Sequence, residues 1–564
     1  MTSSRSGIAG TLAGGVDVLV IGGGITGAGV ALDAASRGYR VGLVERADYA
    51  CGTSSRSTKL IHGGIRYLPQ GHIGLVRDAL RERTLLLRLA PHVARPLPFV
   101  VPLYASTRRP LGLRLPAVVR PFTPLGVRLG LLAYDLFAGD PALRHRVVAR
   151  ETLEREVPDL RTDGLRAAFV YYDARTDDVR LTHSVLATAR AHGAVTLNYA
   201  AVTGLVRAGD RVTGARVEDR LGGQGFEVPA RFVVNATGIW AEEIASMGGR
   251  PAFQIRHSKG VHLVLRPGVL RGAMAIVIPE TDDGRLAFIV PWADRWVLGT
   301  TDDSYAGNLD TVAATPADIA YLLDHANRYL TRPLRASDIT ATYAGVRPLV
   351  AAAAGSTAAL SRDHHLSISP GGLVTITGGK LTTYRKMAED TVDAIVARDG
   401  GGRPGRTAEI PLTGSAGLAG AEAALGAAPL APDQRTHLLE TYGGAAAEIA
   451  ALIAGDPVLA RRLIDTAPVT AAEVVYACRA EQAVTLADCL YLRTRLAVLD
   501  AGAADQAADT VNALLGLHLG WDGAELTRQR GRYEAMRARE PALSWNSSAP
   551  ISDVAPRGQI CPSN

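Results

Sequence analysis

The N-terminal part of the chain alternates short apolar runs with a helical pattern. Residues 16–21 (VDVLVI) and 39–44 (YRVGLV) have the length and composition typical of buried strands. Between them, the spacing of apolar residues over about 25–37 predicts a helix. A strand, a helix and a second strand in immediate succession predict a parallel pair of strands, and therefore an α/β fold.

Further along, the pattern divides the chain into three regions. Helices are predicted at about 73–89 and 179–192, and a buried strand at 231–235 returns the chain to the first sheet. Strand-like runs dominate residues 250–345, which predicts a large antiparallel sheet. Beyond about residue 405 the pattern is helical and rich in Ala, Leu and Glu, which predicts a separate all-α domain.

The turn after the first strand carries glycines in the spacing G-x-G-x-x-G. Gly22 allows the tight turn, Gly24 allows the backbone to approach a pyrophosphate, and Gly27 allows the helix to pack on the strand. The N-terminus of the helix then offers free N–H groups to the phosphate. Glu45, at the end of the second strand, is placed to bind a ribose 2′-hydroxyl and would repel a 2′-phosphate. These features predict a site for NAD or FAD and argue against NADP.

Composition narrows the possible partners. The net charge of +6 over 564 residues comes almost entirely from arginine, since the only lysines are Lys59, Lys259, Lys380 and Lys386. This balance suits anionic small molecules or anionic lipid, and no dense basic and aromatic patch indicates nucleic-acid binding. The four cysteines lack metal-ligand spacing, so no metal site is predicted. No apolar run approaches the roughly 18 residues of a spanning helix, so the protein is expected in the cytoplasm or on a membrane surface.

Residues 96–137 combine prolines, arginines and apolar residues in an unusual way. The segment fits an excursion packed on the domain. It also fits an amphipathic element that contacts a bilayer or a partner subunit, chiefly over residues 108–137. The sequence leaves both interpretations open.

Several motifs, in order along the chain, make it similar to the FAD-dependent, respiratory (quinone-linked) glycerol-3-phosphate dehydrogenase family. The resemblance covers about residues 16–530 and rests on VIGGGITGAGVALDAASRG, TSSRSTKLIHGGIRYL, VNATG, GTTD, YAGVRPL, GGKLTTYRKMAED and EVVYACRAEQAVTLADCLYLRTRLA. It implies a Rossmann-like FAD-binding domain, an antiparallel-sheet substrate domain in the layout of amino-acid oxidases, and a C-terminal all-α domain.

The domain boundaries follow from these patterns and from the resemblance. We expect a flexible leader at 1–15, an FAD-dependent oxidoreductase region at 16–405, a helical domain at 406–540 and a flexible tail at 541–564. Within the oxidoreductase region, the expected FAD-binding segments are about 16–95, 165–245 and 340–400, and the substrate domain is about 96–164 and 246–339.

The resemblance also implies the reaction. Glycerol 3-phosphate is oxidised to dihydroxyacetone phosphate, FAD is reduced, and the quinone pool takes the electrons. A peripheral location at the inner face of the cell membrane and a possible homodimer are expected with it. The alternatives are a glycerol-3-phosphate oxidase that uses oxygen, an FAD-linked amine or amino-acid oxidase, and a flavin-binding scaffold without catalysis.

Binding the phosphate dianion of this substrate requires cationic side chains. Planar arginine forks suit it, and Arg66 and Arg347 are the candidates because they lie inside the family motifs, with Tyr67 adding a hydroxyl. Lys380 lies at a helix start, where the helix dipole disfavours a lysine, so it has a local reason to be there. It is expected to stabilise charge on the reduced flavin or to bind a substrate oxygen, and Arg347 to assist catalysis.

A base is needed for the 2-hydroxyl proton. His62 and His262 are both candidates, and the sequence does not decide between them. Besides the glycine turn and Glu45, the expected cofactor-binding residues are Thr53, Ser54, Ala236, Thr237, Gly238, Gly378, Gly379, Lys380, Leu381 and Thr382.

Overall fold

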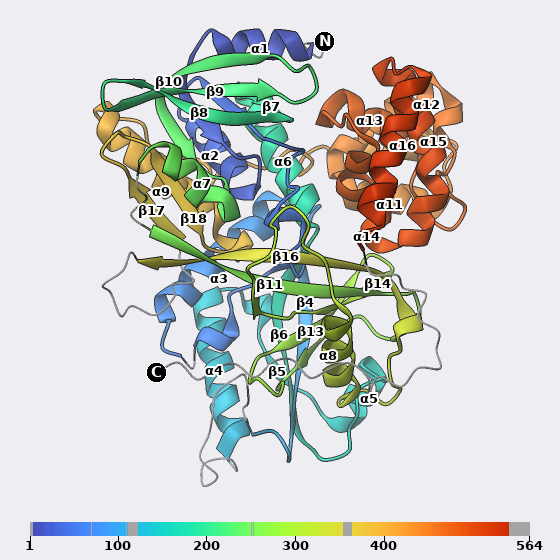
Figure 1. Ribbon diagram of the computed structural model, residues 1–564. Coiled ribbons are helices and arrows are strands. Elements are labelled where there is room, and N and C mark those ends of the chain that lie inside the picture. Colours follow the sequence, from blue (N-terminus) through green and yellow to red (C-terminus); the bar gives the residue numbers. More distant parts are fainter. Residues whose placement is uncertain are drawn as a thin grey trace.

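The computed structural model of the chain describes residues 4–68, 70–108, 110, 122–249, 251, 253–352 and 364–540. Two sheets with their covering helices form the larger part of the molecule, and a helical domain lies beside them (Figure 1). The predicted α/β architecture with a C-terminal all-α domain is thereby confirmed.

The first sheet contains the predicted strand–helix–strand unit. Its strand order is β17-β18-β10-β1-β2-β7, and β1 pairs in parallel with β2 on one side and with β10 on the other. β8 and β9 extend it as antiparallel strands from β10. The strands are β1 (Val16–Ile21), β2 (Val41–Val44), β7 (Val195–Leu197), β8 (Ala200–Ala208), β9 (Arg211–Asp219), β10 (Gly225–Asn235), β17 (His364–Ile368) and β18 (Val374–Gly378).

Three helices pack together against this sheet. α2 (Ile25–Ser36) lies between α6 (Asp178–Ala191) and α9 (Tyr384–Asp399), as Figure 1 shows. Their apolar faces share one core with β1, β2, β10 and β18. Because both faces of the central strands are covered, β1 and β2 are almost continuously apolar rather than alternating. α7 (Ala241–Met247) follows β10.

The second sheet has the order β15-β11-β14-β13-β12-β4-β6-β3, with β16 beside β11 and β5 beside β6. All its pairs are antiparallel except the pair of β4 and β12. α8 (Pro316–Asn327) packs on it and shares its core. The strands are β3 (Leu60–Ile61), β4 (Ala94–Tyr104), β5 (Arg146–Val147), β6 (Leu165–Thr176), β11 (Phe253–Leu265), β12 (Ala275–Ile278), β13 (Ala287–Trp292), β14 (Arg295–Gly299), β15 (Asp303–Ser304) and β16 (Ile339–Ala352).

Three strands of this sheet come from segments that the sequence assigns to FAD binding. β3 and β6 pair with each other, and β16 pairs with β11 along its whole length, from Phe253–Ala352 to Leu265–Ile339. β6 and β16 therefore lie in the second sheet, although the expected FAD-binding segments begin near residues 165 and 340. All three strands contribute residues to the cavity described below, among them Leu60, Tyr171 and Arg347.

The N-terminal leader, which the sequence predicts to be flexible, contains a helix in its described part. α1 (Arg5–Ala13) forms a helix capped by Ser4, and Leu12 is fully buried against the first sheet. Arg5 anchors it, since its guanidinium donates to Asp219 at 2.9 Å and to the Asn198 carbonyl at 2.5 Å. Long-range pairing of this kind leaves no trace in the local Ser/Gly-rich composition.

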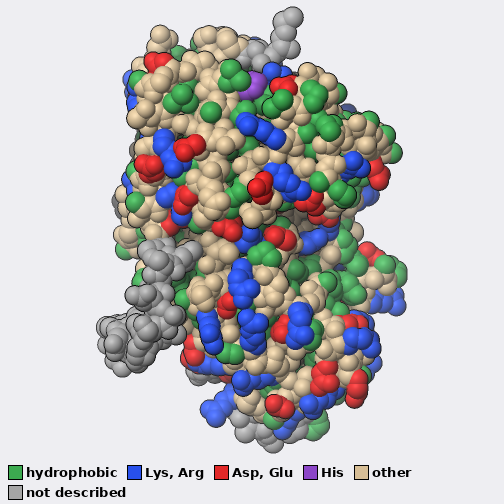
Figure 2. Space-filling model, turned by 90° about the vertical axis from the view of Figure 1, so that its right-hand side faces the viewer, with side chains coloured by type: hydrophobic (Ala, Val, Ile, Leu, Met, Phe, Trp, Pro, Cys, Tyr) green, Lys and Arg blue, Asp and Glu red, His purple; other side chains and the backbone are tan. Residues whose placement is uncertain are grey.

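The helical domain has a core of its own. Its helices are α10 (Leu418–Ala427), α11 (Pro432–Tyr442), α12 (Ala446–Gly455), α13 (Ala471–Glu481), α14 (Leu496–Leu499), α15 (Ala501–Leu519) and α16 (Gly523–Arg537), and a π-helix spans Asp488–Arg493. The expected flexible tail, residues 541–564, lies outside the described residues. On the face of the molecule in Figure 2, basic and acidic side chains are interspersed, so the positive net charge is not gathered there.

α4 (Thr123–Ala138) lies at the end of the molecule remote from the first sheet (Figure 1), beside α3 (Ile73–Leu89), and α5 (Arg150–Glu156) is nearby in the chain. In the unusual segment before α4, residues 96–104 form part of β4, whereas residue 109 and residues 111–121 lie outside the described residues. Among the described helices, none combines the length and hydropathy needed to cross a bilayer.

Candidate active site

A cavity of about 410 Å³ lies between the two sheets. Its walls come from the turn after β1, the segment after β2, the ends of β10 and β18, and strands of the second sheet. All predicted site residues but one line it: Gly22, Gly24, Glu45, Thr53, Ser54, His62, Arg66, Tyr67, Ala236, Thr237, Gly238, His262, Arg347, Gly378, Gly379, Lys380, Leu381 and Thr382.

The exception, Gly27, lies behind the glycine turn. A Cβ atom at Gly27 would stand 1.9 Å from the carbonyl oxygen of Gly22, so only glycine fits there. Gly22 itself has a φ of +109°, which a residue with a Cβ atom adopts only at a cost. Gly24 caps α2, and the Ile25 N–H donates to Ser54 Oγ at 2.9 Å. The N-terminus of this 12-residue helix thus faces the cavity with its positive dipole end, which favours an anion.

Glu45 holds the turn from the other side. Its Oε2 accepts the Gly23 N–H at 2.6 Å and its Oε1 accepts the Ala47 N–H at 3.0 Å. Burial raises the pKa of Glu45, and these two N–H bonds oppose the rise. The carboxylate therefore lines the cavity where a ribose is expected and also orders the glycine turn.

Residues 51–58, which we call the wall segment, follow β2 and form one side of the cavity. All of them except Ser55 line it. The Thr53 hydroxyl donates to the Val346 carbonyl at 2.7 Å, which ties the segment to β16 of the second sheet. Thr58 Oγ1 lies 2.9 Å from Nε2 of His262. The wall segment thus extends from the N-terminus of α2, which Ser54 contacts, to His262, which Thr58 contacts.

The loop after β18 closes the opposite side. Gly378 and Gly379 have φ angles of +78° and +69°, and this double turn leads into a 3-10 helix, Leu381–Thr383. The Thr382 hydroxyl joins the loop to His62, because it accepts the His62 N–H at 3.0 Å. The loop thus lines the cavity from Gly378 to Thr382.

Cations gather at this end of the cavity. Arg66, Arg347 and Lys380 all line it, and Arg285 joins them from the turn just before β13. Arg66 donates to the Tyr67 hydroxyl at 3.0 Å, and the Lys380 ammonium lies 4.2 Å from the centre of the Tyr67 ring. Tyr67 thus orients two of the predicted substrate-binding cations.

Acidic groups offset this positive charge only in part. Nη1 of Arg347 lies 3.2 Å from Asp302. Burial lowers the pKa of Arg347; Asp302 opposes that shift, whereas Arg66 and Arg285 add to it. Cations that repel one another around a cavity stabilise a bound anion, and planar guanidinium groups suit a phosphate.

The two candidate histidines differ in access. His262 is 1% exposed, its Nε2 contacts Thr58, and its ring stacks on Tyr343 with centres 4.7 Å apart. His62 is half-buried in the cavity wall. Burial lowers the pKa of His62 to about 3, and Lys380 and Arg66 contribute to the shift. Both rings are neutral at pH 7, since burial also takes the pKa of His262 well below its usual value.

Several residues that line the cavity are not predicted from the sequence. Arg285, Thr300 and Asp302 line the cationic end, and Thr58 and Trp240 line other parts of the cavity. The GTTD motif that contains Thr300 and Asp302 was a signal for those two. Nothing local distinguishes Arg285 from the many other arginines, because only its place at the start of a cavity-lining strand matters.

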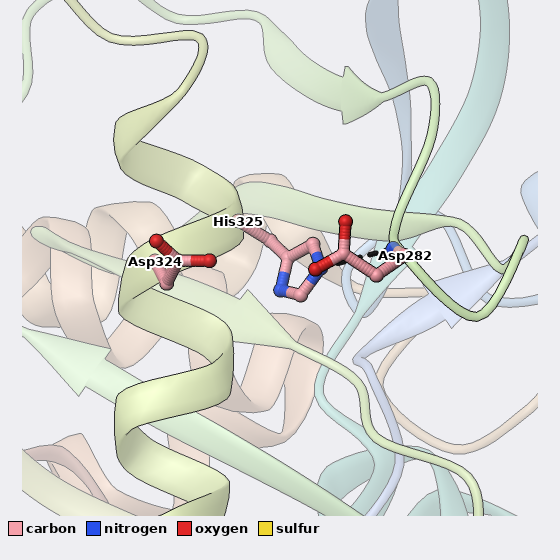
Figure 3. Close-up of side chains that lie close together, drawn as sticks. All are labelled: Asp282, Asp324 and His325. Atoms are coloured by element: carbon pink, nitrogen blue, oxygen red, sulfur yellow. Dashed lines mark hydrogen bonds and ion pairs between the residues drawn. The ribbon is translucent and has the colours of Figure 1, made fainter. Parts of the chain in front are cut away.

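A cluster of Asp282, Asp324 and His325 is shown in Figure 3 and has potential metal ligands within reach of one another. His325 Nδ1 lies 2.7 Å from the Tyr321 carbonyl and must donate to it, while Nε2 accepts the Asp282 N–H at 3.0 Å. Both ring nitrogens are thus engaged. Arg328 pairs with both carboxylates, so the cluster is an ion-pair network and no metal is assigned to it.

The main cavity fits FAD. A helix N-terminus beside the turn at Gly22 suits a pyrophosphate, Glu45 suits a ribose diol, and the backbone at Gly378 to Leu381 suits a planar ring with amide-like edges. The cations at Arg66 and Arg347 then remain for a separate anion. The donor set thus matches the parts of this cofactor and leaves room for a substrate.

Comparison with known protein families gives two matches. The family described as FAD dependent oxidoreductase matches residues 17–385, and the C-terminal domain of alpha-glycerophosphate oxidase matches residues 405–526. Together they cover both sheets and most of the helical domain.

Individual relatives agree with these matches. The chain is 40% identical over 532 residues to glycerol-3-phosphate dehydrogenase 2 of Mycobacterium tuberculosis, covering 92% of this chain and 87% of the relative. It is 38% identical to the human mitochondrial glycerol-3-phosphate dehydrogenase, covering 90% and 71%. Among solved structures, the glycerol-3-phosphate dehydrogenase of Bacillus halodurans complexed with FAD is 30% identical, with a TM-score of 0.77 and coverage of 96% and 98%.

Proposed function

The chain belongs to the glycerol-3-phosphate dehydrogenase family of FAD-dependent oxidoreductases, and on this basis we propose that it oxidises sn-glycerol 3-phosphate to dihydroxyacetone phosphate. The observation that carries the proposal is the cationic end of the cavity. Arg66, Arg285, Arg347 and Lys380 surround one volume next to the loop after β18. FAD, when bound, supplies the two-electron acceptor for the hydride that leaves C2 of the substrate.

The cations bind and orient the phosphate of the substrate. Arg347 is held by Thr300 Oγ1 at 3.1 Å and by Asp302 at 3.2 Å, so its fork is fixed before the substrate arrives. Fixed forks bind a phosphate at a lower entropy cost than mobile ones. Arg66 and Lys380 complete the grip from the opposite wall, with Tyr67 between them. The glycerol carbons are thereby directed toward the flavin side of the cavity.

His62 is our candidate for the base that takes the proton of the 2-hydroxyl. It is neutral and half-buried in the cavity wall, whereas His262 is almost fully buried and already engaged with Thr58. The depressed pKa of His62 arises from burial, Lys380 and Arg66. A bound phosphate dianion offsets both cations, so substrate binding raises the pKa of His62 and makes it a better proton acceptor.

The electron acceptor that we propose is a membrane quinone. α4 supports contact with a membrane, because the helix and its N-cap residue Phe122 expose large apolar side chains at helical spacing: Phe122 66%, Leu125 57%, Leu129 57%, Leu132 49% and Leu136 79%. A continuous apolar stripe of this kind on a surface helix is typical of an element that lies in a membrane interface. The expected location is the inner face of the cell membrane; the homodimer remains a prediction that sedimentation of the holoprotein tests.

The test is anaerobic mixing of the purified holoprotein with glycerol 3-phosphate while the flavin absorbance is followed. Bleaching that a quinone analogue reverses rapidly and air reverses slowly supports the dehydrogenase. Rapid reoxidation by air with release of peroxide would instead make it an oxidase. Absence of bleaching would refute the proposed substrate.

A further inference from the structure

The helical domain touches the back of the wall segment, whose front lines the cavity. Leu492 of the helical domain packs with Ala50 and Val179 in one apolar cluster, which Cys51 and Tyr491 border. The Tyr49 hydroxyl donates to Gln482 Oε1 at 2.6 Å. The chain just before and within the wall segment therefore rests on the helical domain.

A first buried ion pair anchors the start of the wall segment. Arg493 Nη1 lies 2.6 Å from Asp48 Oδ2, and Nη2 lies 3.0 Å from Oδ1, in a two-pronged contact. The two side chains are 0% and 2% exposed. Asn198 adds a donor to the same carboxylate at 2.9 Å. Asp48 comes three residues before the wall segment, so this pair fixes where the segment begins.

A second anchor holds the other end. Arg495 lies 3.2 Å from Asp177 and 3.4 Å from Asp178. Asp178 in turn accepts from the Ser57 N–H at 3.0 Å, from the Ser57 hydroxyl at 2.7 Å and from Lys59 Nζ at 2.6 Å. Asp178 and Lys59 are both fully buried. The residues on either side of Thr58 are therefore fixed by a carboxylate that the helical domain contacts.

Thr58 connects the anchored wall segment to His262 in the cavity. Its hydroxyl lies 2.9 Å from Nε2 of His262, and its neighbour Ser57 accepts the Tyr343 hydroxyl at 2.9 Å through its carbonyl. Tyr343 stacks on His262. The position of His262 is thus set jointly by Thr58 and Tyr343, and both depend on the backbone of Ser57.

We propose that the helical domain positions the wall segment, with Arg493 and Arg495 as the positioning residues. Through the wall segment, the helical domain governs the affinity of the protein for its cofactor and the position of the His262 ring. The inference rests on the proposed function, because it takes the cavity to be an FAD site. It assigns a role to the helical domain beyond packing. Removing one partner of a buried ion pair destabilises a fold, but Asp178 keeps its pair with Lys59 when Arg495 is replaced. Thermal unfolding, measured beside FAD release, then separates an effect on positioning from an effect on folding.

The experiment compares Arg495→Met with Arg528→Met, a matched substitution in the same domain. Arg528 is exposed and pairs with Glu525, one turn away on the same helix. Holoprotein is diluted and the released FAD is measured by its fluorescence, alongside thermal unfolding. We expect the dissociation constant of FAD to rise at least tenfold in Arg495→Met, to stay within twofold in Arg528→Met, and to be partly restored in Arg495→Lys. A rise of less than twofold in Arg495→Met overturns the proposal.

A double-mutant cycle tests the link to His262. If Arg495 acts through Thr58, the rate of flavin reduction in Arg495→Met combined with Thr58→Val falls no further than in Thr58→Val alone. Losses that multiply would sink this part of the inference. Should Arg495→Met fail to fold, Asp177→Asn removes the partner charge and keeps the N-cap of α6, so the same measurements apply.

These readouts separate the two proposals. If the wild-type holoprotein contains FAD that glycerol 3-phosphate does not bleach, the substrate assignment fails, yet the FAD-release comparison still decides the role of Arg495. If the wild type bleaches normally and Arg495→Met retains FAD equally well, the positioning role fails and the proposed function stands.

Discussion

Arg347 offers the most direct test of the phosphate site. Its Nη1 lies 3.2 Å from the Thr301 carbonyl and from Asp302, and its Nη2 lies 3.1 Å from Thr300 Oγ1. The side chain remains 35% exposed, so part of its fork is open to the cavity. Arg347→Met removes the fork and the charge while it keeps a similar side-chain length.

The expected loss of binding free energy follows from the number of hydrogen bonds that Arg347→Met removes. A hydrogen bond between charged groups contributes about 1.5–3 kcal/mol, and the open edge of the fork provides one or two of them. Arg66, Arg285 and Lys380 stay in place and retain part of the affinity. We therefore expect a loss of about 2–4 kcal/mol, which corresponds to a weakening of glycerol 3-phosphate binding by roughly 30- to 700-fold.

The assay is anaerobic stopped-flow reduction of the flavin over a range of glycerol 3-phosphate concentrations. The dissociation constant should rise as calculated, while reduction by glycerol, which lacks the phosphate, should change little. Asp302→Asn is the control, because it removes the acidic partner and keeps the fork, so affinity should not fall. An unchanged dissociation constant for glycerol 3-phosphate in Arg347→Met would refute the assignment of this fork to the phosphate.

The remaining predictions concern pH, the glycine turn and the membrane. The pKa of His62 is lowered to about 3, so the unfolded state binds more protons than the folded state between about pH 3 and 6.5. The free energy of unfolding should therefore increase as the pH is raised through this window, and it should increase less steeply in His62→Gln, as denaturant titrations at several pH values can show. His62→Gln should also slow flavin reduction by about 10²- to 10⁴-fold, and an unaltered rate would exclude it as the base. Gly27→Ala should abolish FAD binding and lower stability by about 1–3 kcal/mol or more in calorimetry, whereas Gly126→Ala, whose Cβ meets nothing within 4 Å, should leave both intact. Leu136→Gln should reduce flotation with anionic liposomes and Leu517→Gln, 77% exposed in the helical domain, should not; equal flotation of the two variants would contradict membrane contact through α4.

The sequence predicts those residues of the site that belong to short local motifs. Gly22, Gly24 and Glu45 belong to one strand–turn–helix–strand unit, in which the spacing alone places a phosphate and a ribose. Arg66 and Lys380 lie in motifs whose resemblance to a known family carries their role. The cavity brings these residues together although more than 300 positions separate Arg66 from Lys380.

The parts that the sequence misses depend on pairing between distant segments. β16 belongs with β11, and α1 is held by Asp219, because of contacts that no local periodicity reports. Arg285 gains its place from the sheet that carries it, and the network from Arg495 through Asp178 to Thr58 exists only once two domains meet. The sequence shows which chemical group a residue offers. The fold determines which other residues that group contacts, and the sequence does not show those contacts.

The strand order of the first sheet also constrains how the protein is made. β1 leaves the ribosome early, yet its neighbour β10 follows only at Gly225–Asn235, and β18, which precedes the loop at Lys380, ends at Gly378. At about 5–20 residues per second, synthesis of the intervening chain takes on the order of half a minute. During that interval one edge of β1 lacks its native partner, a state prone to association with other chains. Cofactor insertion therefore waits until about two thirds of the chain has been synthesised, and the anchors at Arg493 and Arg495 arrive later still.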